Sequence, residues 1–309
     1  MVMRVVAGTA NRSLVVAVAA SAGTELAACE VERFPDGELR PHVAEMRGDD
    51  VYVVEPTGPP VNEHLAELLL LLDACRRAGA DRLTAVVPYF AYARQDRRGS
   101  AGEAVGARVV ADTLAAVGTD RLVVVDPHTV ALEAMCAMPV EMLTAVPVLA
   151  AALRSMIAES AVVVAPDLGA VKLAERYASL LQRNVAVVRK VRTSGETVEA
   201  HELVGDISGR PAVVVDDMIS TGATIEATMN VIVGYGGVED FVVAVTHGLL
   251  VGGAIDRISL RGMRRLLVTD TVTTPEAGTL EVCSVAGLLG DALGRLHRDE
   301  PLDDLLLHA

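Results

Sequence analysis

The sequence predicts an α/β fold in which parallel sheets are flanked by helices. Short Val-rich runs recur along the chain, and segments with a helical pattern lie between them. Continuous aliphatic runs are typical of strands that a parallel sheet buries on both faces. A regular alternation of such strands with helices favours parallel pairing. Hydrophobic residues make up 51% of the chain, which is enough for a large buried core.

The boundaries between strands and helices matter most, because ligands of parallel α/β sheets bind beyond the carboxyl ends of the strands. The expected strands are the runs at residues 51–54, 85–87, 122–125, 161–165, 212–215 and 241–245. The expected helices lie at residues 62–77, 103–117, 146–157, 170–181, 224–233 and 286–296. Asn62 has a side chain suited to cap the first of these helices, and Gly79 lies just past its end.

The alternating pattern occurs twice within the 309 residues, a length that suits two domains. One series of strands ends near Asp126, and a second begins after Pro147. We therefore expect an N-terminal domain at residues 1–145 and a C-terminal domain at residues 146–309. The last helix is expected to pack back on the N-terminal domain.

The charge balance excludes ordinary nucleic-acid binding, because 41 acidic and 27 basic residues give a net charge of −14. No run of about 18 apolar residues predicts a membrane span, and no secretory signal is recognisable. The four cysteines are too widely spaced to indicate a zinc site or a disulfide framework, so we expect free thiols and a cytoplasmic protein. Only two basic residues are lysines, Lys172 and Lys190.

The strongest candidate site follows the Val-rich run at residues 212–215. That run leads into Asp216 and Asp217, then into a small, hydroxyl-bearing loop and a helix. The loop residues are Ser220, Thr221, Gly222, Ala223 and Thr224. Loop amides and a helix N-terminus can hold a phosphate, and two carboxylates can accept hydrogen bonds from a sugar diol. The structural alternative is an aspartate that caps the helix beside a flexible turn, but the hydroxylated loop favours a phosphate-sugar site.

The patterns of the Walker A loop and of the dinucleotide-binding loop are both absent from the sequence. The segment VVVDDMISTGATIEA instead resembles the ribose-5-phosphate loop of phosphoribosyltransferase-type proteins. Further segments, in matching order and spacing, resemble the ribose-phosphate pyrophosphokinase family over nearly the whole chain. They are RFPDGE at 33–38, the stretch 71–98 that contains PYFAYARQDRR, VVVDPHT at 123–129 and VVVAPDLGA at 162–170.

The resemblance implies two phosphoribosyltransferase-type domains and a diphosphokinase that uses ATP and ribose 5-phosphate. In that family the anomeric hydroxyl of the sugar attacks the β-phosphorus of ATP, and AMP leaves. Diphosphoryl transfer depends on positioning and charge stabilisation, so it needs cationic side chains and Mg²⁺. A homo-oligomer, either a dimer or a multiple of dimers, is also implied, because the family's adenine loop reaches across a subunit boundary.

Lys190 and Arg192 match the family's catalytic lysine and arginine, which lie on a loop that closes over the phosphates. A compact ammonium group could neutralise charge that develops on the transferred group. The alternative is a solvated basic loop, and the scarcity of lysine in the chain favours the functional interpretation. Lys172, in contrast, lies in a helical pattern and is interpreted as part of a solvated helix face.

The resemblance also implies residues that bind ATP and metal. The ATP-binding residues are Phe34, Asp36, Gly37, Glu38, Arg94, Gln95, Asp96 and His128. The metal-binding residues are His128 and Asp167. Each kind has a structural alternative: a simple turn around Gly37, an aromatic in the core or at a subunit interface, a structural histidine, and a helix cap at Asp167.

Four positions depart from the bacterial pattern of the family, namely Pro127, Ala170, Ser220 and Ala223. Ser220 keeps a hydroxyl but removes a negative charge, while Ala223 adds a methyl where the backbone can approach a ligand. Residues 99–105 lack the basic residue and the Pro-Ile-Ser/Thr run of the bacterial regulatory segment. They are more similar to the archaeal-type branch of the family, which predicts weak or absent inhibition by ADP.

Two other functions remain open at this point. A phosphoribosyltransferase that acts on a base would account for residues 216–224 but leaves RFPDGE and YARQDRR unexplained. A non-catalytic regulatory homologue of the synthetase would fit the four departures, although Lys190, Arg192 and His128 are all retained.

Overall fold

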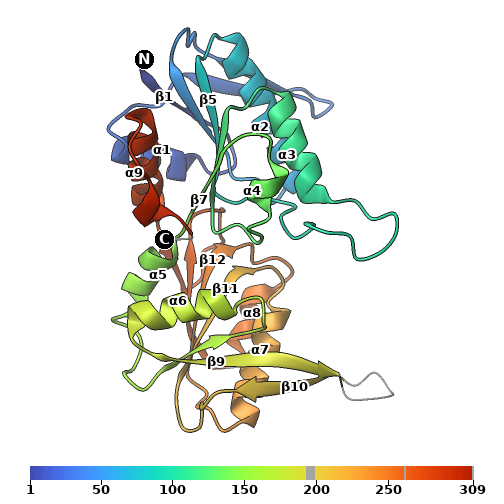
Figure 1. Cartoon of the computed structure of the whole chain (residues 1–309), viewed down its shortest axis with the longest axis vertical. Coiled ribbons are helices and arrows are strands. Elements are labelled where there is room, and N and C mark those ends of the chain that lie inside the picture. The colour runs from blue at the N-terminus through green and yellow to red at the C-terminus, as the bar shows by residue number, and fades with distance from the viewer. Residues whose placement is uncertain (193–198, 261, 308–309) are drawn as a thin grey trace. The chain divides into compact units, whose positions relative to one another are not determined.

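The computed structural model describes residues 1–192, 199–260 and 262–307, without the side chains of residues 190–192, 199 and 200. The chain divides into two compact units. Unit 1 contains Met1–Thr144, Thr271–Thr273 and Ser284–Ala309, and unit 2 contains Ala145–Asp270 and Thr274–Cys283. Each unit has a parallel sheet with flanking helices (Figure 1), which confirms the expected fold class.

Unit 1 is built on a five-stranded parallel sheet with the strand order β1-β4-β5-β6-β7. The strands are β1 (Met3–Ala7), β4 (Asp50–Val54), β5 (Arg82–Val87), β6 (Arg121–Val125) and β7 (Val140–Leu143). Every residue of β4 is buried, as expected for a central strand that is covered on both faces. Because the strands are parallel, the segments that follow them meet at one edge of the sheet, which we call the carboxyl edge; the opposite one is the amino edge.

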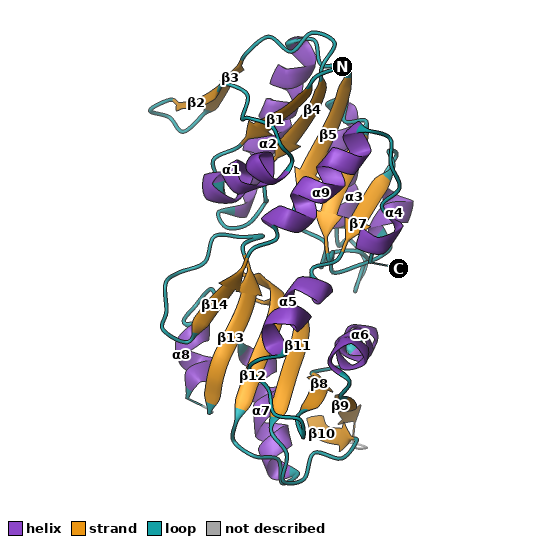
Figure 2. Ribbon diagram, turned by 90° about the vertical axis from the view of Figure 1, so that its left-hand side faces the viewer, coloured by secondary structure: helices purple, strands orange, loops and turns teal. Residues whose placement is uncertain are grey.

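Helices cover both faces of this sheet. The helices α2 (Val61–Arg77), α3 (Gly106–Ala116) and the short α4 (Leu132–Met135) bury leucines in one core with residues of β4, β5 and β6. On the other face, α1 (Arg12–Ser21) packs against α9 (Ala286–His297), as Figure 2 shows.

A two-stranded antiparallel hairpin extends from unit 1 (Figure 2). Its strands are β2 (Cys29–Arg33) and β3 (Leu39–Val43), and β3 contacts α2. Residues 34–38 form the tip of the hairpin, so one of the candidate motifs lies at an exposed turn.

The C-terminal segment returns to unit 1. After α9, a 3-10 turn η1 (Asp303–Leu305) brings the chain alongside β7. There Leu306 forms an isolated bridge with Leu143, and the Leu307 N–H donates to the Met142 carbonyl at 2.7 Å. The last described residues therefore pair with β7, which lies at the opposite side of the sheet from β1.

Unit 2 contains a seven-stranded sheet with the order β10-β9-β8-β11-β12-β13-β14. The strands are β8 (Val162–Ala165), β9 (Asn184–Arg192), β10 (Glu199–Val204), β11 (Ala212–Ile219), β12 (Phe241–Gly248), β13 (Met263–Thr269) and β14 (Leu280–Cys283). Neighbouring strands are parallel except β9 and β10, which form an antiparallel arm at one side of the sheet (Figure 1).

Two pairs of helices cover the sheet of unit 2. The helices α5 (Val146–Leu153) and α6 (Val171–Leu181) share one core, in which Tyr177 is fully buried. The helices α7 (Ala223–Gly234) and α8 (Ala254–Ser259) share the core on the other face. The chemistry-bearing turns between strands and helices are thus held on a rigid, aliphatic layer.

Two helix starts differ from the sequence-based expectation. The helix α2 begins at Val61 with Pro60 at the N-cap, so the prediction that Asn62 caps it is wrong; the Asn62 side chain instead accepts a hydrogen bond from the Tyr92 hydroxyl. The helix α3 begins at Gly106, later than expected. The Glu103 carboxylate accepts hydrogen bonds from the backbone N–H groups of residues 99 and 100, which holds that segment in a loop.

The structure also bears on the cysteines and on the length of the helices. All four cysteines are free thiols. In the part of the chain that the structure describes, no helix is both long and apolar enough to span a membrane.

Candidate active site

The segment expected to bind a sugar phosphate lies at the carboxyl edge of the unit 2 sheet. The strand β11 continues beyond its Val-rich run, so Asp216 and Asp217 belong to the strand itself. Asp216 pairs in register with Val245 of β12, and its Oδ1 accepts a hydrogen bond from the Asp217 N–H at 2.9 Å. The helix α7 begins at Ala223, so residues 220–222 form the short turn between strand and helix.

Gly222 makes this turn possible. It is the N-cap of α7 and has a φ of +78°, a conformation that side chains with a Cβ rarely adopt. A Cβ at this position would also lie 3.1 Å from Ile258 Cγ2 and 3.2 Å from the Ala254 carbonyl oxygen of α8. The first amides of α7 have no acceptor within the helix, so the turn presents N–H groups to an anion.

The turn is fixed by hydrogen bonds to its own carbonyl oxygens. Arg257 of α8 donates to the Thr221 carbonyl at 2.7 Å, and the Val251 N–H donates to the Ser220 carbonyl at 3.0 Å. Thr221, Ala223 and Thr224 are exposed, and Ser220 is half-buried. The backbone is therefore held from one side while the hydroxyls and amides remain accessible from the other.

Three carboxylates from two adjacent strands come together at this edge. Asp216 and Asp217 lie near the end of β11, which runs to Ile219, and Asp167 follows β8, which pairs with β11. Burial, followed by the negative charge of Asp217 and a smaller contribution from Asp167, raises the pKa of Asp216 well above its usual range. No ion pair joins Asp216 to a basic side chain among the described residues, so the group is suited to a cation or to donors of a ligand.

Asp167 also has a structural role. Its Oδ1 accepts hydrogen bonds from the N–H groups of Gly169 at 2.7 Å and Ala170 at 3.1 Å, just before α6 begins at Val171. These bonds form a turn just before α6 and not a helix cap, because the N-cap of α6 is Ala170 and has no side-chain cap hydrogen bond. The charge of Asp167 still reaches Asp216.

The acids fit a magnesium ion only in part. Within the described residues, no group of three or more His, Cys, Asp or Glu side chains is arranged to hold a metal ion. Mg²⁺ commonly keeps several waters and takes one or two carboxylates together with substrate phosphates. A divalent cation bound at Asp167 would relieve the repulsion among the three carboxylates. These residues therefore fit a Mg²⁺ ion that is held partly by the protein and partly by substrate phosphates.

Lys190 and Arg192 lie on β9, next to the strand that leads to Asp167. Val187 of β9 pairs with Ala165, the last residue of β8, so the backbone of Lys190 continues past the carboxyl edge. Lys190 pairs with His201 of β10 and Arg192 with Glu199. The side chains of Lys190 and Arg192 lie outside the described part of the structure, as do residues 193–198.

The first ATP motif forms the tip of the β2–β3 hairpin. The Gly37 N–H donates to the Phe34 carbonyl at 2.9 Å, and the Glu38 N–H donates to Asp36 Oδ1 at 3.1 Å. The Phe34 ring is half-buried under the Arg40 guanidinium, 5.2 Å from the ring centre. The turn that the sequence allowed as an alternative is present, and it leaves Asp36 and Glu38 exposed.

The remaining predicted residues of unit 1 follow β5 and β6 at the carboxyl edge. Arg94 and Gln95 are exposed and Asp96 is half-buried, in the loop after β5. His128 is exposed shortly after β6, next to a buried Asp126 with a φ of +37°. His128 belongs to unit 1 and Asp167 to unit 2, so the two expected metal residues are contributed by different units.

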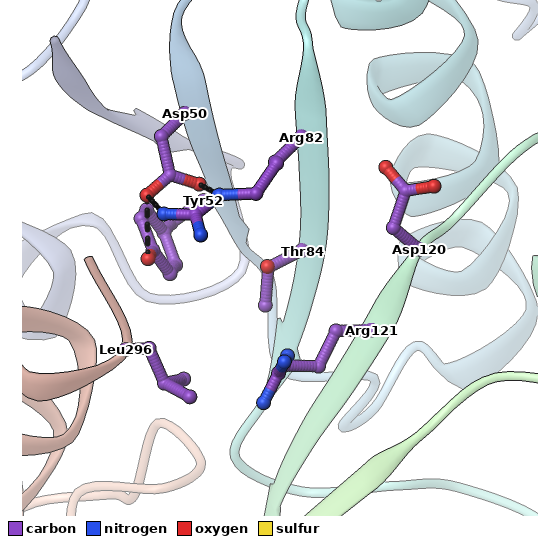
Figure 3. A pocket seen from close by; sticks show the side chains of 7 residues that line it. All are labelled: Asp50, Tyr52, Arg82, Thr84, Asp120, Arg121 and Leu296. Atoms are coloured by element: carbon purple, nitrogen blue, oxygen red, sulfur yellow. Dashed lines mark hydrogen bonds and ion pairs between the residues drawn. The ribbon is translucent and has the colours of Figure 1, made fainter. Parts of the chain in front are cut away.

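A small cavity of about 80 Å³ lies at the amino edge of unit 1 (Figure 3). Its charged groups are paired: Asp50 accepts from Arg82 at 2.6 Å, from the Tyr52 hydroxyl at 2.9 Å and lies 2.7 Å from His297 Nδ1. Arg121 pairs with Glu141. Since His297 belongs to α9, this network fastens the C-terminal segment to the sheet and is not a candidate catalytic site.

Sequence reasoning missed a pair of buried acids at the carboxyl edge of unit 1. Glu55 follows β4 directly, and Glu67 lies on α2; both are almost completely buried. Glu67 accepts from the Thr9 N–H and hydroxyl at 2.7 Å each, and Glu55 accepts from the Ala10 N–H. Burial, followed by the charge of Glu67, raises the pKa of Glu55 to about 9. The position of Glu55 immediately after a Val-rich run is the signal that could have found it.

A parallel sheet whose strand ends in two aspartates, a small hydroxylated turn and a helix defines a phosphoribosyltransferase-type protein. The profile of the phosphoribosyl transferase domain matches residues 142–249. The profile of the N-terminal domain of ribose phosphate pyrophosphokinase matches residues 3–118. The chain belongs to the ribose-phosphate pyrophosphokinase family, because close relatives match it along both units.

The ribose-phosphate pyrophosphokinase of Aquifex aeolicus is 38% identical over 307 residues and aligns over 98% of each chain. That of Staphylococcus saprophyticus is 38% identical over 303 residues, which cover 96% of this chain and 94% of the relative. The crystal structure of phosphoribosylpyrophosphate synthetase from Mycobacterium smegmatis has a TM-score of 0.90 and 33% identity, and covers 97% of this chain and 100% of that one.

These comparisons confirm the family and the enzyme class expected from the sequence. The relatives are bacterial, so the finer expectation of an archaeal-type branch finds no support among them.

Proposed function

We propose that the chain transfers the diphosphoryl group of ATP to the anomeric hydroxyl of ribose 5-phosphate, which gives 5-phosphoribosyl 1-diphosphate and AMP. The observation that carries this proposal is the strand, turn and helix at residues 216–224, in a chain that matches the family over its whole length. The sugar oxygen forms a bond to the β-phosphorus, and the bond from that phosphorus to the oxygen of AMP breaks.

We assign ribose 5-phosphate to the carboxyl edge of the unit 2 sheet. Asp216 and Asp217 accept hydrogen bonds from the ribose hydroxyls, because both carboxylates lie on β11 just before the turn that begins α7. The 5-phosphate is held by Ser220, Thr221, Gly222, Ala223 and Thr224. The first-turn amides of α7 and the positive end of its dipole support this assignment.

We assign ATP to the two exposed motifs of unit 1 and to His128. The hairpin tip supplies Phe34 as a stacking ring, with Asp36, Gly37 and Glu38 around it as acceptors for the exocyclic amine of adenine. Arg94, Gln95 and Asp96 lie on an exposed loop, where the guanidinium can pair with phosphate oxygens in bidentate fashion.

We propose that Asp167 in unit 2 and His128 in unit 1 each act as a Mg²⁺ ligand beside substrate phosphates. When bound, the ion neutralises phosphate charge and polarises the phosphorus centre. Asp167 is suited to this task because its Oδ1 is already oriented by two backbone amides.

We assign stabilisation of the transferred group to Lys190 and Arg192. Their strand runs beside β8 and leads past the edge at which Asp167 lies. A Lys ammonium and an Arg guanidinium there would stabilise negative charge that is spread over the phosphate oxygens in the transition state.

We also propose that the protein is a cytoplasmic homo-oligomer. The adenine motif lies at the tip of a hairpin that extends from unit 1, where a second copy can approach it. The free cysteines suit a reducing compartment. Light scattering of the purified protein tests the oligomer, and a monomeric mass would contradict it.

ADP inhibition is proposed to be weak or absent, as residues 99–105 suggest. Here Glu103 accepts from the Gly99 N–H at 2.6 Å and from the Ser100 N–H and hydroxyl at 3.0 and 2.8 Å. These hydrogen bonds, the Ser100 hydroxyl first, lower the pKa of Glu103, so a carboxylate occupies donors that a phosphate would need. Strong cooperative inhibition by ADP at saturating ATP would contradict this proposal.

The deciding experiment is incubation of the protein with ATP, Mg²⁺ and ribose 5-phosphate. AMP is expected only when the sugar phosphate is present, and Lys190→Ala should remove most of the activity. Lys172→Ala is the matched control, because Lys172 is an exposed lysine on α6. Absence of sugar-dependent AMP, or equal loss of activity in both variants, would contradict the proposed function.

A further inference from the structure

A buried threonine after β4 connects to the loop that follows β5. Thr57 is only 2% exposed, and its hydroxyl donates to the Tyr89 carbonyl at 2.9 Å. The same hydroxyl accepts from the Ala91 N–H at 2.8 Å, and the Thr57 N–H donates to the Tyr89 carbonyl at 3.0 Å. One side chain thus bridges an acceptor and a donor that lie two residues apart on the loop.

The bridged backbone is the part of the loop that lies directly before its exposed charges. Tyr89, Phe90 and Ala91 are buried, and Tyr92 then has a φ of +64°, which turns the chain towards solvent. The Gln95 N–H donates to the Tyr92 carbonyl at 2.8 Å. The position of the exposed residues after this turn therefore depends on the position of the buried residues before it.

The other end of the loop is held by the start of α3. The Ala107 N–H donates to the Gln95 carbonyl at 3.3 Å. A Cβ at Gly106 would lie 2.7 Å from Gln95 Oε1 and 3.0 Å from Tyr92 Cδ1, so this position has no room for a side chain. The exposed part of the loop therefore lies between two fixed points. The Tyr92 hydroxyl also donates to the Asn62 side chain, but Thr57 is the side chain that binds the loop backbone on both sides of Phe90.

We propose that Thr57 is a positioning residue for ATP: its hydroxyl fixes the loop backbone and thereby orients Arg94 and Gln95 towards the phosphates. This inference rests on the proposed function and assigns a role to a residue outside its binding motifs. Thr57 itself touches neither substrate. Its removal leaves the buried Ala91 amide without its acceptor, which the loop relieves by shifting outward.

The alternative is that Thr57 only stabilises unit 1. In that case its substitution would lower the melting temperature without a selective effect on either substrate. A positioning role predicts a selective effect, because Arg94 and Gln95 serve ATP, while ribose 5-phosphate is bound by unit 2. The ratio of the two KM values therefore separates the two roles.

The test compares Thr57→Val, which keeps the shape but removes the hydroxyl, with Thr57→Ser, which keeps the hydroxyl. Thr57→Val should raise the KM for ATP by about tenfold and change the KM for ribose 5-phosphate by less than about twofold. Thr57→Ser should stay within about twofold of the wild type for both.

Thr119→Val is the matched control. Thr119 is also a buried threonine of unit 1, at 6% exposure, and its hydroxyl bonds to no atom of the described residues. It should leave both KM values unchanged. If Thr57→Val does not fold, as judged by circular dichroism, the KM values of Thr57→Ser and Thr57→Ala are compared instead, because these two variants also differ by the hydroxyl group.

Calorimetric binding of Mg-ATP to the same variants keeps this inference separate from the proposed function. A wild type that binds Mg-ATP but forms no AMP defeats the proposed function, and Thr57 is then judged by the dissociation constants alone. A wild type that binds no Mg-ATP overturns both. Equal KM shifts for both substrates, or unchanged Mg-ATP affinity in a folded variant without the hydroxyl, overturns the role of Thr57.

Discussion

Strand β4 has a buried acid at each end, and the two acids have opposite surroundings. Asp50, at the amino edge, is bound by Arg82 and Tyr52 (Figure 3). It also lies 2.7 Å from Nδ1 of His297. Glu55, beyond the carboxyl end, faces a second carboxylate on Glu67, and no ion pair joins it to a basic side chain among the described residues. The same strand therefore ends in a neutralised acid at one edge of the sheet and an unneutralised acid at the other.

Unit 2 repeats the second arrangement, because Asp216 lies on β11 with the negative charges of Asp217 and Asp167 nearby. Carboxylates that repel one another lower the stability of the fold, and they persist where a ligand supplies the missing charge or donors. The comparison teaches that the acid at the amino edge is held by an ion pair and hydrogen bonds, whereas the acids at the two carboxyl edges lie beside other carboxylates. This contrast can be tested by neutralising one acid at a time.

Asp216→Asn should have the largest effect, and it should move activity and stability in opposite directions. We expect the catalytic efficiency to fall about 100-fold, since a hydrogen bond from a sugar hydroxyl to a charged acceptor is lost. The melting temperature should stay equal or rise, because one of three mutually repelling carboxylates is gone. Steady-state kinetics and calorimetry measure both quantities. The exposed Asp206 provides the control variant Asp206→Asn, and a drop in both activity and stability would contradict the contrast.

Asp50→Asn should lower stability and leave the chemistry intact. It breaks a pair whose acid is buried, at 1% exposure, while the Arg82 side chain is 35% exposed and can reach water. We therefore expect a loss of about 2 kcal/mol in the free energy of unfolding of unit 1, less than for a fully buried pair. Denaturant titration measures it. Asp299→Asn removes the exposed partner of the same Arg82 and should cost almost nothing; equal losses in the two variants would refute the prediction.

Glu55→Gln should reduce the dependence of the free energy of unfolding on pH. The pKa of Glu55 in the folded protein is about 9, above its usual value of 4.5, so the folded state keeps a proton that the unfolded state has lost between these pH values. The free energy of unfolding of the wild type therefore falls as pH rises through this window, and it levels off above pH 9.

In the Glu55→Gln variant this decline should be shallower, so the gain over the wild type is absent below pH 5 and grows by about 1.4 kcal/mol per pH unit towards pH 9. Thermal unfolding at a series of pH values measures the difference. Glu45→Gln, at an exposed acid of the same unit, should reproduce the wild-type slope. Parallel curves for Glu55→Gln and the wild type would show that Glu55 is ionised in the fold.

His297→Ala should have the smallest effect. It removes one of three partners of Asp50 and leaves Arg82 and Tyr52 in place, so we expect a loss of about 1 kcal/mol. A double-mutant cycle with Asp50→Asn measures how much of this loss comes from the shared contact. If the losses in free energy of unfolding from the two substitutions simply add, the contact between His297 and Asp50 does not contribute to stability, and the prediction is wrong.

Much of the sheet framework was predictable, because runs such as 122–125 and 241–245 consist of hydrophobic residues, mostly valine, which favour buried strands. Parallel order followed from the alternation with helices. The β9–β10 arm was not predictable, since its charged residues Lys190 and Arg192 read as a loop after a strand. Two helix starts were misjudged because tertiary contacts and a loop were not visible in the sequence. The Asn62 side chain binds Tyr92 instead of capping α2, and Glu103 holds residues 99 and 100 in a loop before α3.

The sequence predicted those site residues whose side-chain type and whose position at the end of a strand both indicate ligand binding. Asp216, Asp217 and the turn at Gly222 lie at the carboxyl edge, as strand-end reasoning required. Their mutual repulsion with Asp167 could not be read from the sequence, because the register between β8 and β11 brings them together. Thr57 escaped notice for the same reason, since its partners lie one strand further along the chain.

The return of the C-terminal segment to unit 1 has a consequence for the order of folding during synthesis. The five strands of that unit leave the ribosome early, but α9 and the residues that join β7 are made only after the whole of unit 2. Until then, the apolar face of α1 that α9 covers is open to solvent, and Asp50 has no His297 beside it. The nascent first unit must therefore persist in an incomplete form, in the size range where chains depend on chaperones, until the last helix closes it.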